Sequence, residues 1–214
     1  LKLEPYIQYL FSVPVIPNSY YSLQNVEADW FFADSLTNKG SGRNMGIDIT
    51  LEQFLNKGLY YLATVSLFDS HYKGGDNIVR ETRFNKQYVV NLLAGKEWSV
   101  GTENRNSFSF NARLSLFGGD RTIPVLMQQS VQQTEVIYDY ANAFSTKKPD
   151  AQILSFSINY RINKEKHTSL WSLHVINVLM QKEFEGYEYN SVTRKVEKQE
   201  DPFFIPYISY KLEF

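Results

Sequence analysis

Polar and apolar residues alternate without a break over Ser107-Phe108-Ser109-Phe110-Asn111-Ala112-Arg113-Leu114-Ser115-Leu116. Because successive side chains of a β-strand point to opposite faces of a sheet, this segment predicts a strand with one apolar and one polar face. Clear or weaker copies of the pattern lie at 1–9, 45–52, 59–68, 88–94, 154–162, 171–175 and 208–214. We therefore expect an all-β chain of about eight strands, with at most a helical turn in the loop 125–150. Pro5 predicts an edge or a bulge in the first strand, because proline cannot donate to a ladder.

The connections between these strands alternate in length. Tight turns are expected at 56–58, 99–106 and 163–166, and long loops at 12–44, 69–85, 117–150 and 179–203. An antiparallel up-and-down meander with long loops at one end and tight turns at the other is typical of outer-membrane β-barrels. Five outward residues cover ~33 Å of strand, which a tilt of about 45° reduces to ~23 Å, close to the apolar band of such barrels.

Aromatic residues flank the expected tight turns. They are Tyr60, Tyr61, Trp98, Phe108, Tyr160, Trp171 and Phe214. Amphipathic rings favour the interface between lipid and water, so this placement predicts an aromatic girdle.

Composition narrows the class of protein. The chain has 214 residues and a formal net charge of -1, which suits one domain over 1–214 and gives no electrostatic reason to expect nucleic acid. It contains no run of about 18 apolar residues, so no membrane-spanning helix is expected. Cysteine is absent, which excludes disulfides and thiol chemistry within these residues. The start at Leu1, without an initiator Met, leads us to expect a mature fragment of a longer protein.

Several motifs carry a resemblance to a known family. The last strand, 207–214, resembles the signature read by the outer-membrane assembly machinery, with Ile208, Tyr210, Leu212 and Phe214 as its apolar positions. TonB-dependent outer-membrane receptors, in the branch with a carboxypeptidase-regulatory-like N-terminal domain, have similar segments. These segments are Val13–Pro17, Gly42–Asp48, Tyr72–Asp76, Arg83–Asn85, Asn91–Trp98 and Gly118–Arg121.

The resemblance covers nearly the whole chain and implies a location and a role. Such receptors are 22-stranded barrels with a lumenal plug, so the chain would supply the last eight strands. The resemblance implies uptake of a nutrient ligand across a bacterial outer membrane. The implied partners are outer-membrane lipid, the barrel assembly machinery, TonB through a missing N-terminal part, and a surface lipoprotein as a further candidate.

Loop residues are the candidates for ligand binding. Exposed rings can stack on a ligand or can pack loop against loop, and both explanations stay open for Trp30, Phe31, Phe32, Tyr138, Tyr140 and Phe144. The Gly-Gly-Asp repeats at 74–76 and 118–120 would place Asp76, Asp120 and Arg121 at a ligand mouth. We favour a backbone role for these glycines, because Gly tolerates positive φ where a strand turns into a loop.

No pattern indicates an enzyme, a cofactor or a metal. Asp48 and Glu52 share the polar face of one strand, where solvated carboxylates are commoner than catalytic ones. His71, His167 and His174 have no metal-ligand spacing, and the sequence has no phosphate loop, nucleophile elbow or zinc-protease motif.

Two other functions compete with the receptor. One is a self-contained eight-stranded outer-membrane barrel with a structural or adhesive role, although the Ser, Thr and Asn of the polar rows suit a wider, watered lumen. The other is a soluble lipid-binding barrel, which requires the apolar rows to point into a closed interior. Its inward residues would be Phe108, Phe110, Leu114, Phe156 and Ile158.

Overall fold

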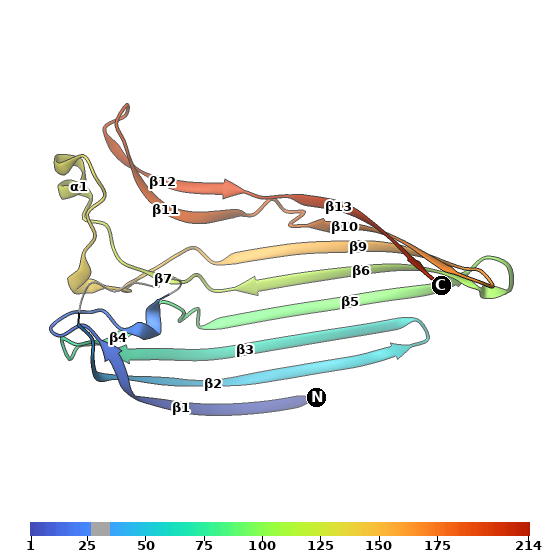
Figure 1. The fold of residues 1–214 in the computed structure, drawn as a ribbon, viewed down its shortest axis with the longest axis horizontal. Coiled ribbons are helices and arrows are strands. Elements are labelled where there is room, and N and C mark those ends of the chain that lie inside the picture. The colour runs from blue at the N-terminus through green and yellow to red at the C-terminus, as the bar shows by residue number, and fades with distance from the viewer. Residues whose placement is uncertain (27–34) are drawn as a thin grey trace.

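The computed structural model describes residues 1–26 and 35–214 and is dominated by one antiparallel sheet. Its strands follow one another as neighbours in chain order, a meander (Figure 1). They are β1 (Lys2–Val15), β2 (Thr37–Asn56), β3 (Leu59–Lys73), β5 (Tyr88–Val100), β6 (Asn106–Phe117), β9 (Ala151–Asn163), β10 (Thr168–Ile176) and β13 (Ile205–Glu213). These eight strands are the ones that the alternating segments predict, so the all-β antiparallel fold is confirmed.

Smaller elements occupy the long connections. The strand β4 (Val79–Glu81) pairs with the end of β3, and β7 (Arg121–Thr122) pairs with β8 (Thr146–Lys147). The helix α1 (Met127–Gln133) lies in the loop where a helical turn is expected. Short 3-10 turns lie at Leu23–Asn25 and Tyr140–Asn142 in the long connections, and at Thr102–Asn104 in the tight turn between β5 and β6.

The segment expected as a last long loop is instead a β-hairpin. Its strands are β11 (Lys182–Asn190) and β12 (Lys195–Pro202), which pair only with each other in the described part of the chain. A register shift between Phe184 and Gly186 breaks the period of two, so the alternation is hidden in the sequence.

The two ends of the sheet differ. Connections of two to five residues join β2 to β3, β5 to β6 and β9 to β10, whereas the other connections are long and carry the small elements. Figure 1 shows the tight turns together at the right and the long connections at the left. The predicted alternation of loop lengths is therefore confirmed.

The strand register aligns the apolar side of each strand with that of its neighbour. Phe110 lies opposite Ile158, and Ile158 lies opposite Leu173, which lies opposite Ile208. At the turn end the same register joins an aromatic row across five strands, formed by Trp98, Phe108, Tyr160, Trp171 and Tyr210. The rings of Trp171 and Tyr210 are 4.6 Å apart, and those of Trp98 and Phe108 are 5.8 Å apart. Four of the seven predicted aromatics, Trp98, Phe108, Tyr160 and Trp171, thus form a continuous row with Tyr210. Tyr60, Tyr61 and Phe214 lie outside this row, and Tyr60 is on the polar face.

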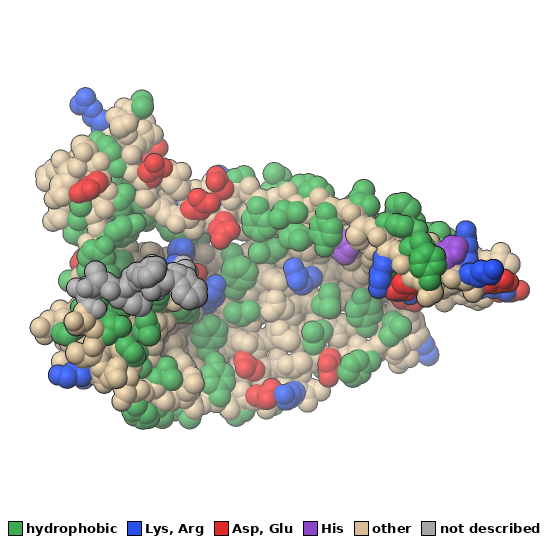
Figure 2. Space-filling model, in the orientation of Figure 1, with side chains coloured by type: hydrophobic (Ala, Val, Ile, Leu, Met, Phe, Trp, Pro, Cys, Tyr) green, Lys and Arg blue, Asp and Glu red, His purple; other side chains and the backbone are tan. Residues whose placement is uncertain are grey.

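This apolar face has no covering layer within the described residues. Ile208 is 73% exposed, Leu3 57% and Phe110 41%. Figure 2 shows hydrophobic side chains projecting along the upper margin of the sheet, over β10 and β13. Soluble monomers rarely expose apolar patches beyond roughly a few hundred Å², so a face of this extent indicates a missing apolar partner.

The opposite face is polar and hydrogen-bonded from strand to strand. Asn111 donates to the Ser157 hydroxyl over 3.0 Å, and Asn159 donates to the Ser109 hydroxyl over 3.1 Å. The Tyr60 hydroxyl donates to Asn111, and its ring occupies the space that a side chain at Gly95 would need. Hydrogen bonds therefore link neighbouring strands on this face.

The outermost strands, β1 and β13, each have one neighbour in the sheet. Pro5 lies in β1 opposite Ile47 without a register shift, and the irregular positions lie between Leu10 and Val15. Of the two alternatives expected at Pro5, an edge strand or a bulge, the described part of the chain has the edge strand. No helix in the described ranges is long and apolar enough to cross a membrane.

We expect Tyr60→Phe to lower the free energy of unfolding by about 1 kcal/mol, because only its hydrogen bond to Asn111 is lost. Tyr60→Ala should cost more, since it also uncovers the backbone at Gly95. Urea unfolding in detergent micelles measures both, and Tyr61→Phe on the apolar face serves as the control. Equal losses for Tyr60→Phe and Tyr60→Ala would show that the ring contributes nothing.

Candidate ligand site at the loop end of the sheet

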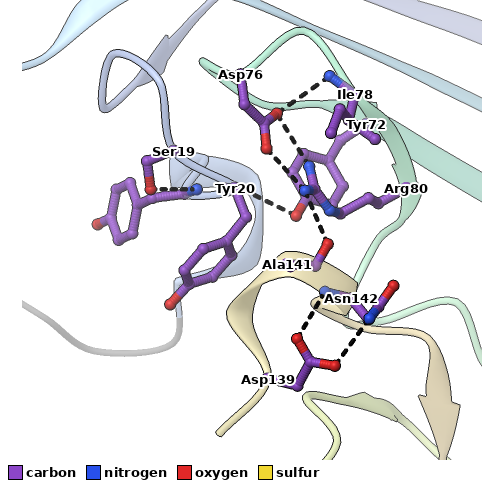
Figure 3. Close-up of polar contacts among 10 residues, drawn as sticks. Ser19, Tyr20, Tyr72, Asp76, Ile78, Arg80, Asp139, Ala141 and Asn142 are labelled. Atoms are coloured by element: carbon purple, nitrogen blue, oxygen red, sulfur yellow. Dashed lines mark hydrogen bonds and ion pairs between the residues drawn. The ribbon is translucent and has the colours of Figure 1, made fainter.

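A buried ion pair in the connection after β3 also contacts the connection after β6. Arg80 lies in β4 with its side chain only 7% exposed, and its guanidinium donates to both carboxylate oxygens of Asp76, over 3.0 and 2.7 Å. The same guanidinium donates to the carbonyl oxygen of Ala141, 61 residues further along the chain, over 3.2 Å (Figure 3). Asp76 therefore fixes the orientation of Arg80, and Arg80 fixes the loop after β6 against β4.

Aromatic residues pack beside this ion pair. Tyr72, Ala143 and Phe144 form a buried hydrophobic cluster, on which Tyr20 is partly buried. The Tyr72 hydroxyl donates to the Tyr20 carbonyl oxygen over 2.9 Å (Figure 3), and the Tyr20 ring stacks on Tyr140 at 5.1 Å. Burial, together with the neighbouring Tyr140, raises the pKa of Tyr20. The connections after β1 and β6 thus share one small core with the end of β3.

The glycine pairs have a backbone role, but for a different reason from the expected one. Positive φ is absent at both pairs. A side chain at Gly75 would overlap the carbonyl oxygen of Ile16, and one at Gly118 or Gly119 would overlap the carbonyl oxygen of Lys86 or Lys148. Glycine is needed because one loop backbone lies directly against another.

A charged rim lies where the apolar side of the sheet meets the loops, formed by Asp69 with His71 beside it and by Lys147 and Asp150. His71 lies 3.1 Å from Asp69. Lys147 lies 2.8 Å from Asp150, and this hydrogen bond, with one from Tyr88, lowers the pKa of Asp150. On the other side, Lys86 lies 3.1 Å from Asp120 and close to the ring of Phe117, whose position alternates with the apolar row. Arg121 pairs with Glu81. The apolar face therefore has a charged limit at this end and an aromatic limit at the turn end.

The loops enclose two neighbouring cavities. The first, of about 500 Å³, has walls from the connections after β1, β3 and β6 and from the base of the β11–β12 hairpin. The second, of about 460 Å³, lies between the connection after β6 and the hairpin. Both volumes fall in the range that accommodates small-molecule ligands.

The structure gathers only some of the predicted ligand residues. Arg121, Tyr138 and Tyr140 line the first cavity, and Asp120 lines the second. Asp76 lines neither, and its carboxylate is used in the ion pair with Arg80. Trp30, Phe31 and Phe32 lie outside the described residues. For Tyr140, stacking on Tyr20 favours loop packing, although its side chain also borders the cavity.

Several lining residues have no motif in the sequence. Tyr20 and Tyr21, Lys148 and Phe184 come from three different connections. The Tyr20-Tyr21 doublet is the one available signal, because paired aromatics in a loop are candidates for contact with a ligand. Lys148 and Phe184 gain their place only through tertiary contacts between distant loops.

Three residues of the proposed assembly signal lie on the edge strand β13, and the fourth, Phe214, follows its end. Ile208, Tyr210 and Leu212 continue the apolar side of β10, and Phe214 is 97% exposed. Their recognition by an assembly machinery stays a prediction. Among the described residues no group of three or more His, Asp or Glu side chains is placed to hold a metal ion.

The Asp76–Arg80 ion pair predicts a pH dependence of loop order. The hydrogen bond from Arg80 lowers the pKa of Asp76, so the pair stabilises the loops above about pH 4 and loses this effect as the pH falls through the lowered pKa. We expect hydrogen exchange of residues 74–87, corrected for the intrinsic rate, to stay slow at pH 5 and to accelerate below about pH 4. Asp76→Asn should exchange faster at pH 5 to 7 and show less pH dependence.

The matched control is Glu103→Gln, which removes an exposed carboxylate in the tight turn at the other end of the sheet. It should leave exchange at 74–87 unchanged. Identical exchange in the wild type and Asp76→Asn at pH 6 would contradict a structural role for the pair.

Comparison with known proteins does not assign the chain to a family. No family model matches the chain, and neither the curated proteins nor the solved structures contain a match. Any functional assignment therefore depends on the sheet, its two faces and its loops.

Proposed function

We propose that the chain is part of the wall of a β-barrel receptor of the TonB-dependent class, which takes up a nutrient ligand across a bacterial outer membrane. One observation carries the proposal: the register collects the apolar rows of eight strands on one face, and that face is uncovered. Hydrocarbon is an apolar partner that covers such a face without a second protein layer.

The limits of the apolar face support lipid as its partner. The aromatic row lies at one end of the face and the charged rim at the other. A bilayer has this sequence of environments, with an apolar interior between two interfaces where rings and charges are tolerated. Lys96, on the apolar side near the turn, donates to the Lys57 carbonyl oxygen over 2.8 Å, away from the middle of the face. This is the direction expected of a lysine whose stem lies beside lipid.

The polar face supports a watered lumen. Asn and Ser side chains bridge the strands, and the loops pack at one end of the sheet. A lumen lined by small hydrogen-bonding side chains can contain water and a moving ligand, whereas a filled interior would need bulky apolar residues.

The open edges favour a larger barrel over a closed eight-stranded one. In the described part of the chain β1 and β13 do not pair with each other. An unpaired strand edge is not tolerated in hydrocarbon, so the proposal requires further strands beside both edges. The barrel of 22 strands, the plug, the TonB contact and a surface lipoprotein stay predictions from the family resemblance.

The competing soluble barrel requires the apolar rows to pack into a closed interior. Phe110 is 41% exposed and lies against Phe156, at 6.1 Å, on an open sheet. Because the 214 residues contain no Cys, Phe110→Cys and Phe156→Cys can carry single spin labels. Asn111→Cys and Ser157→Cys place matched labels on the opposite face of the same strands.

In proteoliposomes we expect the labels at 110 and 156 to be relaxed more by oxygen, which concentrates in lipid, than by a water-soluble nickel chelate. The labels at 111 and 157 should show the reverse. Protection of 110 and 156 from both reagents would favour the soluble barrel and contradict the proposal.

Fractionation gives an independent check of location. The protein expressed from its own gene should sediment with outer membranes and should migrate faster on a detergent gel before boiling than after it. Recovery as a soluble monomer without detergent would end the receptor proposal.

A further inference from the structure

The two cavities share a wall made by Lys148 and Phe184, which line both. The Lys148 ammonium lies 5.4 Å from the centre of the Phe184 ring and donates to the Phe184 carbonyl oxygen over 3.5 Å. Lys198 of the hairpin lies 5.2 Å from the same ring. Two cations beside one ring hold Phe184 in place by cation–π attraction. The cavities are therefore neighbouring compartments on either side of a fixed aromatic and cationic wall.

Lys148 differs from Arg121 and Lys86, two other cations that line the cavities, in lacking a carboxylate partner. Arg121 pairs with Glu81, and Lys86 pairs with Asp120. Lys148 is half-buried and forms no ion pair within the described ranges, and its ammonium contacts only a ring and a carbonyl oxygen. A cation partly removed from water and without a counter-charge attracts an anionic group of a ligand.

The first cavity presents rings and neutral polar groups to a ligand. Its aromatic residues are Tyr20, Tyr21, Tyr138, Tyr140, Phe144 and Phe184. Tyrosine supplies a rigid apolar surface and a hydroxyl at low entropic cost. Asn25 also lines the cavity and is 7% exposed. Its carboxamide oxygen accepts a hydrogen bond from the backbone amide of Arg83. Its carboxamide nitrogen has no hydrogen-bond partner among residues 1–26 and 35–214. Flat surfaces next to hydroxyl and amide groups complement a ring that has apolar faces and hydroxyl edges.

A sugar ring that bears a carboxylate is complementary to these features of the cavities. The C–H faces of a sugar can lie on the tyrosine rings, its hydroxyls can reach polar side chains, and its carboxylate can meet Lys148. An acidic peptide would also bring carboxylates, at its C-terminus and on flexible side chains, but not on a ring with apolar faces and hydroxyl edges. With a volume of about 500 Å³ on one side of the wall and about 460 Å³ on the other, the site has room for more than one sugar unit.

We propose that the two cavities form one binding site for an acidic oligosaccharide, in which Lys148 binds a carboxylate and Phe184 supports the sugar on both sides of the wall. This proposal rests on the proposed receptor function and names the class of ligand that the receptor takes up.

The test uses the protein expressed from its own gene in lipid nanodiscs, titrated by calorimetry with three probes. Trigalacturonate carries three carboxylates on sugar rings, its trimethyl ester has the same rings without charge, and triglutamate has carboxylates without rings. We expect trigalacturonate to bind about tenfold or more tighter than the ester, the size expected of a charge-assisted hydrogen bond.

Variants of Lys148 and Phe184 separate the contribution of charge to the binding affinity from that of stacking. Lys148→Gln should reduce the affinity for trigalacturonate to that for the ester, and Lys148→Arg should keep most of it. Phe184→Leu should weaken both sugar probes about fivefold, because it removes the ring but keeps apolar bulk. The matched control is Lys164→Gln, in the tight turn at the opposite end of the sheet, which should bind as the wild type does.

Three results would overturn the proposal: no binding of trigalacturonate, unchanged binding by Lys148→Gln, or equally tight binding of triglutamate. The last result would assign the site to acidic peptides. None of them alters the spin-label or fractionation results, so the ligand class and the receptor function fail separately.

Discussion

Strand register is the constraint on which the rest of this structure depends. A shift of one residue between any two neighbours would move an entire apolar row to the polar face. The observed pairing avoids this from β1 to β13, so that Phe110, Ile158 and Ile208 belong to one continuous surface. Tight turns fix this register at one end. Once it is fixed, one face needs an apolar environment and the other needs water or hydrogen bonds.

At the loop end of the sheet, strand pairing no longer satisfies the backbone and side chains. There the chain leaves the sheet, and its backbone groups and side chains must find partners in loops that are far apart in sequence. Arg80 donates a hydrogen bond to the carbonyl oxygen of Ala141, and Tyr72 donates one to the carbonyl oxygen of Tyr20. The glycine pairs allow one loop backbone to lie against another. These contacts build a small core and leave cavities beside it. A sheet on whose apolar face no described residue packs can thus still position loop cavities at its end.

The sequence was sufficient for features that depend on local periodicity. Alternation over 107–116 and its copies predicted the eight strands of the sheet, and turn lengths predicted their order. The sequence does not predict the hairpin β11–β12. The irregularity near Gly186 shifts the period of alternation in β11, and the hairpin has no continuous apolar side. The sequence indicates Arg121 and Tyr138 as cavity residues but gives no signal for Lys148 or Phe184. Their shared wall is made by contacts between residues 36 positions apart, and no short motif encodes such a contact.

The central claim is that the uncovered face meets hydrocarbon. Proteoliposomes containing a phospholipid with a photoactivatable group near the middle of its acyl chain test it most directly, with the labelled peptides mapped by mass spectrometry. The account predicts labelling within β6 and β9, at outward positions such as Phe110 and Ile158, and none in the connection 118–150. Labelling confined to that connection, or no labelling of the sheet, would contradict it.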